Sequence, residues 1–229
     1  MNALTAKKYS NFEIKLIAML CMFVDHLGKI IMLDSESFQT VCGAAGSIAF
    51  PLFAFLLTEG FVHTRNIKIY ALRLLGFAVL SEIPFDLYFN NTLIEFKSNN
   101  VMFTLLIGLI ILFVFSVFEK KDQRYLGLAV IAVALILLQN VLNIFDYGVS
   151  GLLAILVMYF FKDRPHMAYV VAVLTISLMN PSSVNFFALV GMLFVVNYNK
   201  EKGKDIKYLA YLFYPAHLIL LYLLKTFIL

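Results

Sequence analysis

The chain has 229 residues, of which 62% are hydrophobic and only 14% are charged, and its mean hydropathy is +0.89. Soluble globular proteins are about 45–50% apolar and about 25% charged, so this composition excludes a water-soluble fold. A net charge of +4 would favour nucleic acid as the partner of a soluble chain. Here the basic residues stand mainly between hydrophobic stretches, where they set membrane topology, and no nucleic-acid partner is expected.

Nine apolar stretches follow one another, and each is interpreted as a membrane helix because one crossing needs about 20 apolar residues. Together they take up about 180 residues, so a single transmembrane domain over 1–229 is predicted. The first stretch is too long for a signal peptide and is expected to stay uncleaved. The seventh and eighth stretches are short, and either tilted or re-entrant forms fit them. The predicted spans are 14–33, 44–62, 68–89, 101–118, 125–142, 148–161, 167–179, 184–198 and 207–228.

Basic residues occupy the N-terminal tail and alternate connections of this arrangement. Because short basic loops stay in the cytoplasm, the pattern predicts a cytoplasmic N-terminus. No internal repeat of the kind found in many transporters is visible. Cys21 and Cys42 are too few for a disulfide framework or a metal site, so no metal is expected. The basic residues concerned are Lys7, Lys8 and Lys15; Arg65 and Lys68; Lys120, Lys121 and Arg124; Lys162 and Arg164; and Lys200, Lys202, Lys204 and Lys207.

Ionisable side chains also lie inside the predicted spans, where each costs about 2.5–3.5 kcal/mol if it faces lipid. They must therefore converge on a protein interior or a wet cavity. The predicted topology sorts them into a basic zone near the cytoplasm and an acidic, imidazole-bearing zone toward the outside. The inner zone contains Glu59, His63, Arg65, Lys68 and Arg73, the outer zone contains Asp25, His26, Glu82, Asp86 and Asp146, and His217 lies near mid-membrane.

Helical geometry restricts which of these side chains can act together. Asp25 and His26 are consecutive and cannot face each other. His26 is therefore expected to find a carboxylate on another helix, with Glu82 or Asp86 as candidates. These two carboxylates are four residues apart, on either side of Pro84, which tends to kink a helix.

Several of these residues also have a purely structural interpretation. Glu59 and His63 are spaced for an i,i+4 pair that would only lock the end of the second span. Arg65 and Lys68 could serve topology alone, and His217 could be a packing histidine. Asp25 with His26 is harder to explain in this way, because two adjacent ionisable groups must both be satisfied.

Several strings resemble the TraX family. They include Val-Asp-His-Leu-Gly at 24–28, Gly-Ser-Ile-Ala-Phe-Pro-Leu-Phe-Ala-Phe at 46–55, Ser-Glu-Ile-Pro-Phe-Asp at 81–86, Asn-Val-Met-Phe-Thr-Leu at 100–105 and Phe-Tyr-Pro-Ala-His-Leu at 213–218. The resemblance covers essentially the whole chain in the right order. The spacing of Lys15 and His26 is also similar to a basic-x10-His pattern of other membrane acyltransferases.

This resemblance implies an integral-membrane acetyltransferase of the bacterial cytoplasmic membrane that uses acetyl-CoA. The family's name-giving member acetylates the N-terminus of F pilin, which implies a pilin-like or envelope acceptor. Arg65, Lys68 and Arg73 would then hold the phosphates of acetyl-CoA.

His26 would act as general base or as a transient acetyl carrier, with Glu82 or Asp86 fixing its tautomer. Asn100, Thr104 or Tyr214 would donate to the developing oxyanion. The predicted catalytic set is His26, Asp25, Glu82 and Asp86, and the predicted substrate-binding set is Glu59, His63, Arg65, Lys68, Arg73, Asn100, Tyr214 and His217.

Two rival functions stay open. In a proton-coupled transporter or permease, Asp25, His26, Glu82, Asp86 and His217 would form a proton relay. In a noncatalytic envelope assembly protein, the same polar residues would serve helix association.

Overall fold

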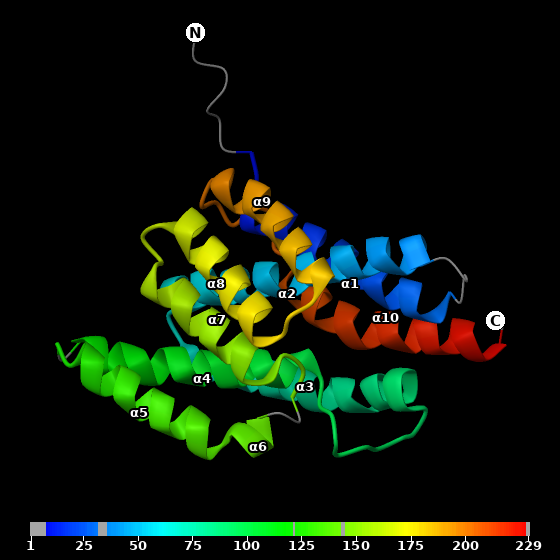
Figure 1. The fold of residues 1–229 in the computed structure, drawn as a ribbon, viewed down its shortest axis with the longest axis horizontal. Coiled ribbons are helices and arrows are strands. Elements are labelled where there is room, and N and C mark those ends of the chain that lie inside the picture. Colours follow the sequence, from blue (N-terminus) through cyan, green and yellow to red (C-terminus); the bar gives the residue numbers. More distant parts are fainter. Residues whose placement is uncertain (1–7, 32–35, 121, 143–144, 228–229) are drawn as a thin grey trace, which may run out of the picture.

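The structure, a computed structural model, describes residues 8–31, 36–120, 122–142 and 145–227. This part of the chain is helical, as predicted, and contains no strand beyond two isolated β-bridges. Figure 1 shows the helices in order. They are α1 (Asn11–Ile30), α2 (Glu36–His63), α3 (Ile67–Asn90), α4 (Val101–Lys120), α5 (Arg124–Leu137), α6 (Gln139–Leu142), α7 (Gly148–Phe160), α8 (Pro165–Met179), the 3₁₀ helix η1 (Ser183–Gly191), α9 (Met192–Val196) and α10 (Lys207–Phe227).

Each predicted span coincides with a helix or with a pair of helices. The predicted span 125–142 is divided into α5 and α6, and 184–198 is divided into η1 and α9. The predicted span ends at 32–33 and 228, with Lys7 and Lys121, lie outside the described residues.

By length and composition, α2, α4 and α10 are each able to cross a membrane. The helices α5, α7, α8 and the segment Val184–Val196 are apolar but shorter. Neither α1 nor α3 has so uniform a composition, because α1 carries Lys15 and Asp25 and α3 carries Arg73, Glu82 and Asp86. The two helices that depart from a simple membrane-span composition thus carry the predicted catalytic set, Asp25, His26, Glu82 and Asp86.

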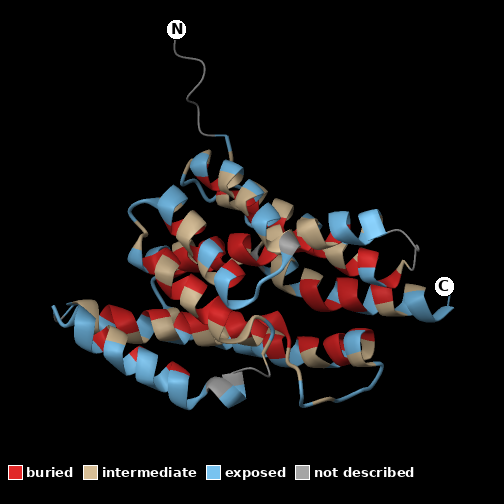
Figure 2. Ribbon diagram, viewed as in Figure 1, coloured by how far each residue is buried: buried red, intermediate tan, exposed pale blue. Residues whose placement is uncertain are grey.

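The two N-terminal helices, α1 and α2, lie side by side along most of their length. Their backbones approach closely because Gly28 faces the side chain of Cys42 and Gly46 faces that of Asp25. α3 packs along α10 and α7 along α8. Figure 2 shows that the buried residues face the shared interior, whereas much of α5 is exposed. That exposed face is apolar, as expected of a lipid-facing surface, and includes Leu126, Val130, Val133, Ile136 and Leu137.

The N-terminal segment, the end of α2 and the link after α9 meet at one end of the molecule. Tyr9 and Tyr198 form a parallel bridge, and the backbone N–H of Asn11 donates to the Glu201 carbonyl over 2.8 Å. The Tyr198 hydroxyl in turn hydrogen-bonds the side chain of Glu59 near the end of α2.

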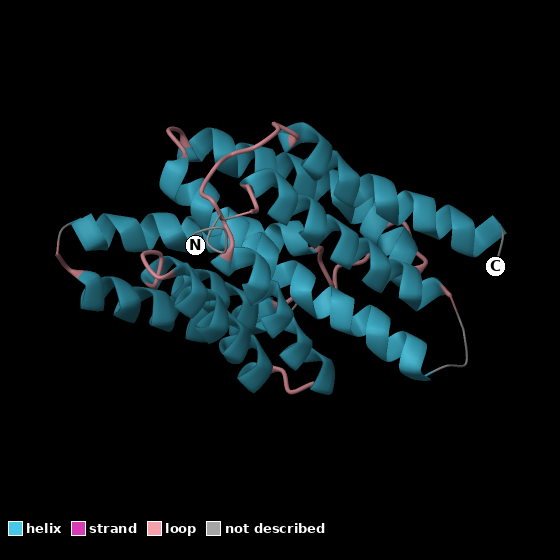
Figure 3. Ribbon diagram, turned by 90° about the horizontal axis from the view of Figure 1, so that it is seen from above, coloured by secondary structure: helices cyan, strands magenta, loops and turns pink. Residues whose placement is uncertain are grey.

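The ends of α4 and α7 join the same end. The ring of Phe61 on α2 lies 5.4 Å from that of Tyr159 on α7. The Tyr159 hydroxyl donates to Glu119 of α4 over 2.9 Å, and the Lys162 ammonium lies 3.3 Å from the same carboxylate. The basic connections therefore gather at one end, and Figures 1 and 3 place the C-terminal end of α10 at the other.

The link between α3 and α4 runs back along α3. Asn91 ends α3 in the left-handed region at φ 52°. The Asn100 side chain then donates to the backbone carbonyl of Ala78 over 2.9 Å, and Ala78 lies midway along α3. α4 therefore begins at about half the length of α3, not opposite its end.

A pair of glycine substitutions tests the close approach of α1 and α2. Gly28→Ala would place a Cβ against the Cys42 side chain, so we expect the free energy of unfolding in detergent to fall by about 1–3 kcal/mol. Gly76→Ala on α3 is the matched control, because a Cβ at this position would meet nothing within 4 Å and alanine favours a helix. An equal response of the two variants in thermal unfolding would contradict the close packing.

Candidate functional site

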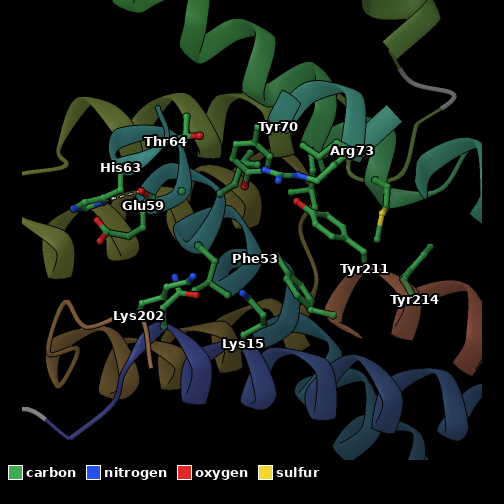
Figure 4. A pocket seen from close by; sticks show the side chains of 18 of the residues that line it. Lys15, Phe53, Glu59, His63, Thr64, Tyr70, Arg73, Lys202, Tyr211 and Tyr214 are labelled. Carbon is green, nitrogen blue, oxygen red and sulfur yellow. Dashed lines mark hydrogen bonds between the residues drawn. The ribbon is translucent and has the colours of Figure 1, made fainter. Parts of the chain in front are cut away.

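A cavity of about 520 Å³ lies toward the end of the molecule where the basic connections meet. Side chains of α1, α2, α3, α4 and α10 and of the link after α9 form its walls (Figure 4). Its volume falls in the range of about 300–1,000 Å³ that is usual for small-molecule sites. The fold therefore provides a ligand-sized cavity among the helices that carry the predicted site residues.

Most of the cavity lining is apolar, and the charged side chains within it are mainly basic. Lys15, Arg73, Lys200 and Lys202 line it, and Glu59 is an acidic residue among them. Figure 4 shows Lys15 and Lys202 on one wall and Glu59 on another. Lys200 and Lys202 are exposed, so the cationic mouth lies at the end of the basic connections. An anionic ligand fits this balance of charge.

Arg73 lies deeper in the cavity and is held by two aromatic residues. Its guanidinium lies 5.8 Å from the ring centre of Tyr70, and it hydrogen-bonds the side chain of Tyr211 (Figure 4). Its Nε is buried and has no hydrogen-bond partner among the described residues. Since a buried donor without a partner is costly, this nitrogen is suited to an acceptor supplied by a ligand.

Two cations of the predicted inner zone lie outside the cavity. Arg65 and Lys68 are exposed and do not line the cavity, whereas Lys200 and Lys202 do. Sequence reasoning gave these lysines a topological role only, because they follow α9 and are distant in sequence from Arg73. No local signal distinguishes a lysine that lines a cavity from one that faces water.

Glu59 and His63 both line the cavity, but not as the predicted side-chain pair. The His63 Nδ1 lies 2.9 Å from the backbone carbonyl of Glu59, the carbonyl one helical turn earlier. The Glu59 carboxylate instead accepts a hydrogen bond from the Tyr198 hydroxyl. The last turn of α2 is thus tied to the link after α9.

His26 of α1 pairs with His217 of α10. The Nδ1 of His26 lies 2.8 Å from the Nε2 of His217, and both residues are buried. The hydroxyl of Tyr88 on α3 donates to the His26 backbone carbonyl over 2.5 Å. The expectation that Glu82 or Asp86 orients the His26 ring is therefore wrong, because the position beside its Nδ1 is taken by an imidazole.

Asp25 lies beside this pair but makes its close contact within its own helix. Its Oδ2 lies 2.6 Å from the Lys29 ammonium, one turn later. The same oxygen is 3.9 Å from the His26 Nε2, which is beyond hydrogen-bond distance. The charge of Asp25 is thus balanced within α1.

Glu82 and Asp86 fasten the link that returns along α3. Glu82 accepts from the Asn100 backbone N–H over 2.9 Å and from its side chain over 2.5 Å. It also accepts from Asn99 over 3.1 Å. Asp86 accepts from the Glu95 backbone N–H over 2.8 Å. Both carboxylates therefore position the start of α4 and do not contact His26.

Of the three predicted oxyanion donors, only Tyr214 lines the cavity. The side-chain N–H groups of Asn100 go to Ala78 and Glu82, and the Thr104 hydroxyl donates to the Asp146 carbonyl. Within the described residues, no group of three His, Cys, Asp or Glu side chains could share a metal ion.

The cavity and the imidazole pair are adjacent, but they are not one chamber. Met22 and Tyr214 line the cavity, whereas His26 and His217 do not. His26 lies four residues beyond Met22 on α1, about 6 Å along the axis, and His217 lies three residues beyond Tyr214 on α10, about 4.5 Å. About one helical turn of α1 and of α10 therefore separates the cavity lining from the imidazole pair.

A double-mutant cycle with Asn100 tests whether Glu82 holds the link between α3 and α4 in place. Each single alanine variant leaves buried partners unsatisfied, so we expect a loss of about 1–3 kcal/mol in unfolding free energy. The double variant should lose less than the sum. Asp163→Ala is the control: because this residue is exposed, the substitution should change the unfolding free energy by less than about 0.5 kcal/mol. Additive losses would show that Glu82 and Asn100 act independently.

Comparisons with known proteins identify the family of the chain. A family profile described as "TraX protein" matches residues 10–225. A probable fimbrial assembly protein FimC, serogroup H1, of Dichelobacter nodosus is 29% identical, with 96% of this chain and 97% of that protein aligned. No solved structure matches. Because the family profile covers nearly the whole chain, the protein belongs to the TraX family.

Proposed function

We propose that this protein is an integral-membrane acetyltransferase that moves an acetyl group from cytoplasmic acetyl-CoA to an amine or hydroxyl acceptor. The observation that carries the proposal is the cationic cavity, which ends one helical turn from a buried, hydrogen-bonded histidine pair. Membership of the TraX family supports the same assignment. The nine predicted crossings and the cytoplasmic N-terminus belong to this proposal.

The charged lining of the cavity suits the phosphates of the donor. Lys15, Lys200 and Lys202 would bind the phosphates of acetyl-CoA, and Arg73 would supply its unpaired Nε to an acceptor atom farther in. The thin thioester arm would then pass Met22 and Tyr214 toward His26. The basic connections within the described residues gather at the end of the molecule where the cavity opens, and the positive-inside rule supports a cytoplasmic position for this mouth.

The reaction needs one base. The acceptor nitrogen or oxygen attacks the thioester carbonyl carbon, and the His26 Nε2 takes the proton that this atom loses. The carbon–sulfur bond then breaks, coenzyme A leaves as the thiolate, and the proton held by His26 passes to this thiolate, which restores the neutral base. The negative charge nearest to the imidazolium formed in between is the Asp25 carboxylate, which lies 3.9 Å from the same nitrogen and is ion-paired with Lys29.

The acceptor is proposed to be a pilin-like protein or another envelope molecule. Support comes from the similarity to a protein named as a probable fimbrial assembly protein. The exposed apolar side chains Leu80, Ile83 and Phe89 of α3 would allow a membrane-embedded acceptor to approach near His26.

A proton-coupled transporter is the second candidate, and the hydrogen bond between His26 and His217 favours it, because two linked imidazoles can pass a proton. The predicted relay is less continuous than expected, since Glu82 and Asp86 bond the α3–α4 link. This function would show as substrate uptake into liposomes driven by a pH gradient without acetyl-CoA.

Purified protein and labelled acetyl-CoA test the enzymatic proposal. We expect hydrolysis or transfer of the label, and His26→Ala should lower kcat about 10²–10⁴-fold because the base is lost. Arg73→Ala should raise KM for acetyl-CoA about tenfold or more. Arg164→Ala is the control, because this exposed arginine lies at the same end but outside the cavity. Full turnover by the His26 variant would remove this residue from catalysis.

The proposed orientation can be tested separately by labelling intact cells with a membrane-impermeant maleimide. In a Cys21→Ala/Cys42→Ala background, Lys97→Cys should react from outside, since its link lies on the side opposite the basic connections. Asp163→Cys should react only after the cells are opened. The reverse pattern would place the cavity mouth outside, away from cytoplasmic acetyl-CoA.

A further inference from the structure

The imidazole of His217 lies in the same plane as that of His26. The two rings are within 4° of parallel, with centroids 5.0 Å apart and the facing nitrogens 2.8 Å apart. These values describe a hydrogen bond made edge to edge in a common ring plane, since a face-to-face stack would not bring two nitrogens so close at that centroid separation. One nitrogen of this pair must donate and the other accept.

The direction of this hydrogen bond follows from the other nitrogen of His217. Its Nδ1 lies 2.8 Å from the backbone carbonyl of Phe213. A carbonyl oxygen can only accept, so the Nδ1 of His217 carries a proton. In a neutral imidazole the Nε2 of His217 is then the bare nitrogen, and it accepts from the Nδ1–H of His26. The bare nitrogen of His26 is consequently Nε2.

The neutral form of the pair suits its surroundings. His217 is 3% exposed and His26 is 8% exposed. A buried imidazolium without a hydrogen-bonded carboxylate would be costly. Asp25 is the nearest carboxylate, but its Oδ2 is bound to Lys29 at 2.6 Å and lies 3.9 Å from His26. A neutral imidazole acceptor orients His26 without placing a second charge in the interior.

Both rings are held in orientation by packing. The Phe213 ring stacks on His217 with centroids 4.8 Å apart, and the Phe23 ring meets it edge-on at 6.4 Å. His26 contacts the rings of Tyr88 and Phe89 at 5.7 and 5.5 Å. The rings therefore cannot turn independently, and the tautomer follows from the geometry.

We propose that His217 is a positioning residue, which holds His26 as the Nδ1–H tautomer so that its Nε2 is the nitrogen available as base. The proposal rests on the proposed acetyltransferase function for its catalytic consequence, but the tautomer itself is independent of any activity. In water, a histidine side chain prefers the Nε2–H form, which would block that nitrogen. His217 thus reverses the intrinsic preference of His26.

Nitrogen-15 NMR of the full chain, labelled at histidine and held in detergent, tests the tautomer. Protonated and bare ring nitrogens have well-separated ¹⁵N shifts, and the chain has only four histidines. Spectra of His63→Gln and His166→Gln identify the signals of the other two. We expect Nδ1–H with bare Nε2 for both His26 and His217 near neutral pH. An Nε2–H tautomer of His26, or an imidazolium at either residue, would overturn the proposal.

Two substitutions of His217 separate positioning from packing. His217→Gln keeps an acceptor, because its amide oxygen can reach the place of Nε2, so His26 should keep the Nδ1–H form and kcat should stay near that of the unsubstituted protein. His217→Leu fills similar space without an acceptor. In that variant His26 should lose the Nδ1–H form, and kcat should fall about 100-fold or more at unchanged KM for acetyl-CoA.

The outcomes distinguish this inference from the proposed function. The expected tautomers in a protein that neither hydrolyses nor transfers acetyl-CoA would leave His217 as the group that sets the tautomer and would reject the acetyltransferase assignment. Equal kcat values for His217→Leu and His217→Gln in an active enzyme would reject the positioning role. If His217→Leu does not fold, the spectrum of the unsubstituted protein and of His217→Gln still decides the tautomer.

Discussion

Polar side chains within the apolar interior of this protein must find their hydrogen bonds inside it, because hydrocarbon offers neither donors nor acceptors. Three solutions occur side by side. Asp25 pairs with Lys29 on its own helix, Glu82 accepts the N–H groups of the link before α4, and two histidines bond each other. Each solution also fixes a piece of structure, so the same requirement builds the fold and the candidate site.

Much of the fold could be predicted, because the length and apolar character of each helix are local properties of the sequence. Within the described residues, every predicted span is mainly helical, and the family resemblance is confirmed over residues 10–225. The break between α5 and α6 and the 3₁₀ segment from Ser183 were not predicted. Nor was the depth at which α4 begins, since it depends on Asn100 meeting Ala78, 22 residues earlier.

The candidate site was predicted in its residue types but not in its pairings. Because burying ionisable groups is costly, the sequence identified His26, Glu82 and Asp86 as residues that need partners. It did not identify which partner each residue contacts. Which partner each one meets depends on how α1, α3 and α10 are rotated about their axes. A carboxylate is the usual companion of a buried histidine, so the sequence favoured one, whereas the fold brings His217 to that position.

The chain of hydrogen bonds that runs from His26 through His217 ends at the backbone carbonyl of Phe213. Any residue at position 213 would supply this carbonyl. Replacement of the phenyl ring would alter the stacking but would leave this final acceptor in place as long as the helix persists. A side-chain substitution therefore removes a member of this hydrogen-bonded chain only at His26 or His217, whereas a substitution at position 213 removes the stacked ring and keeps the acceptor.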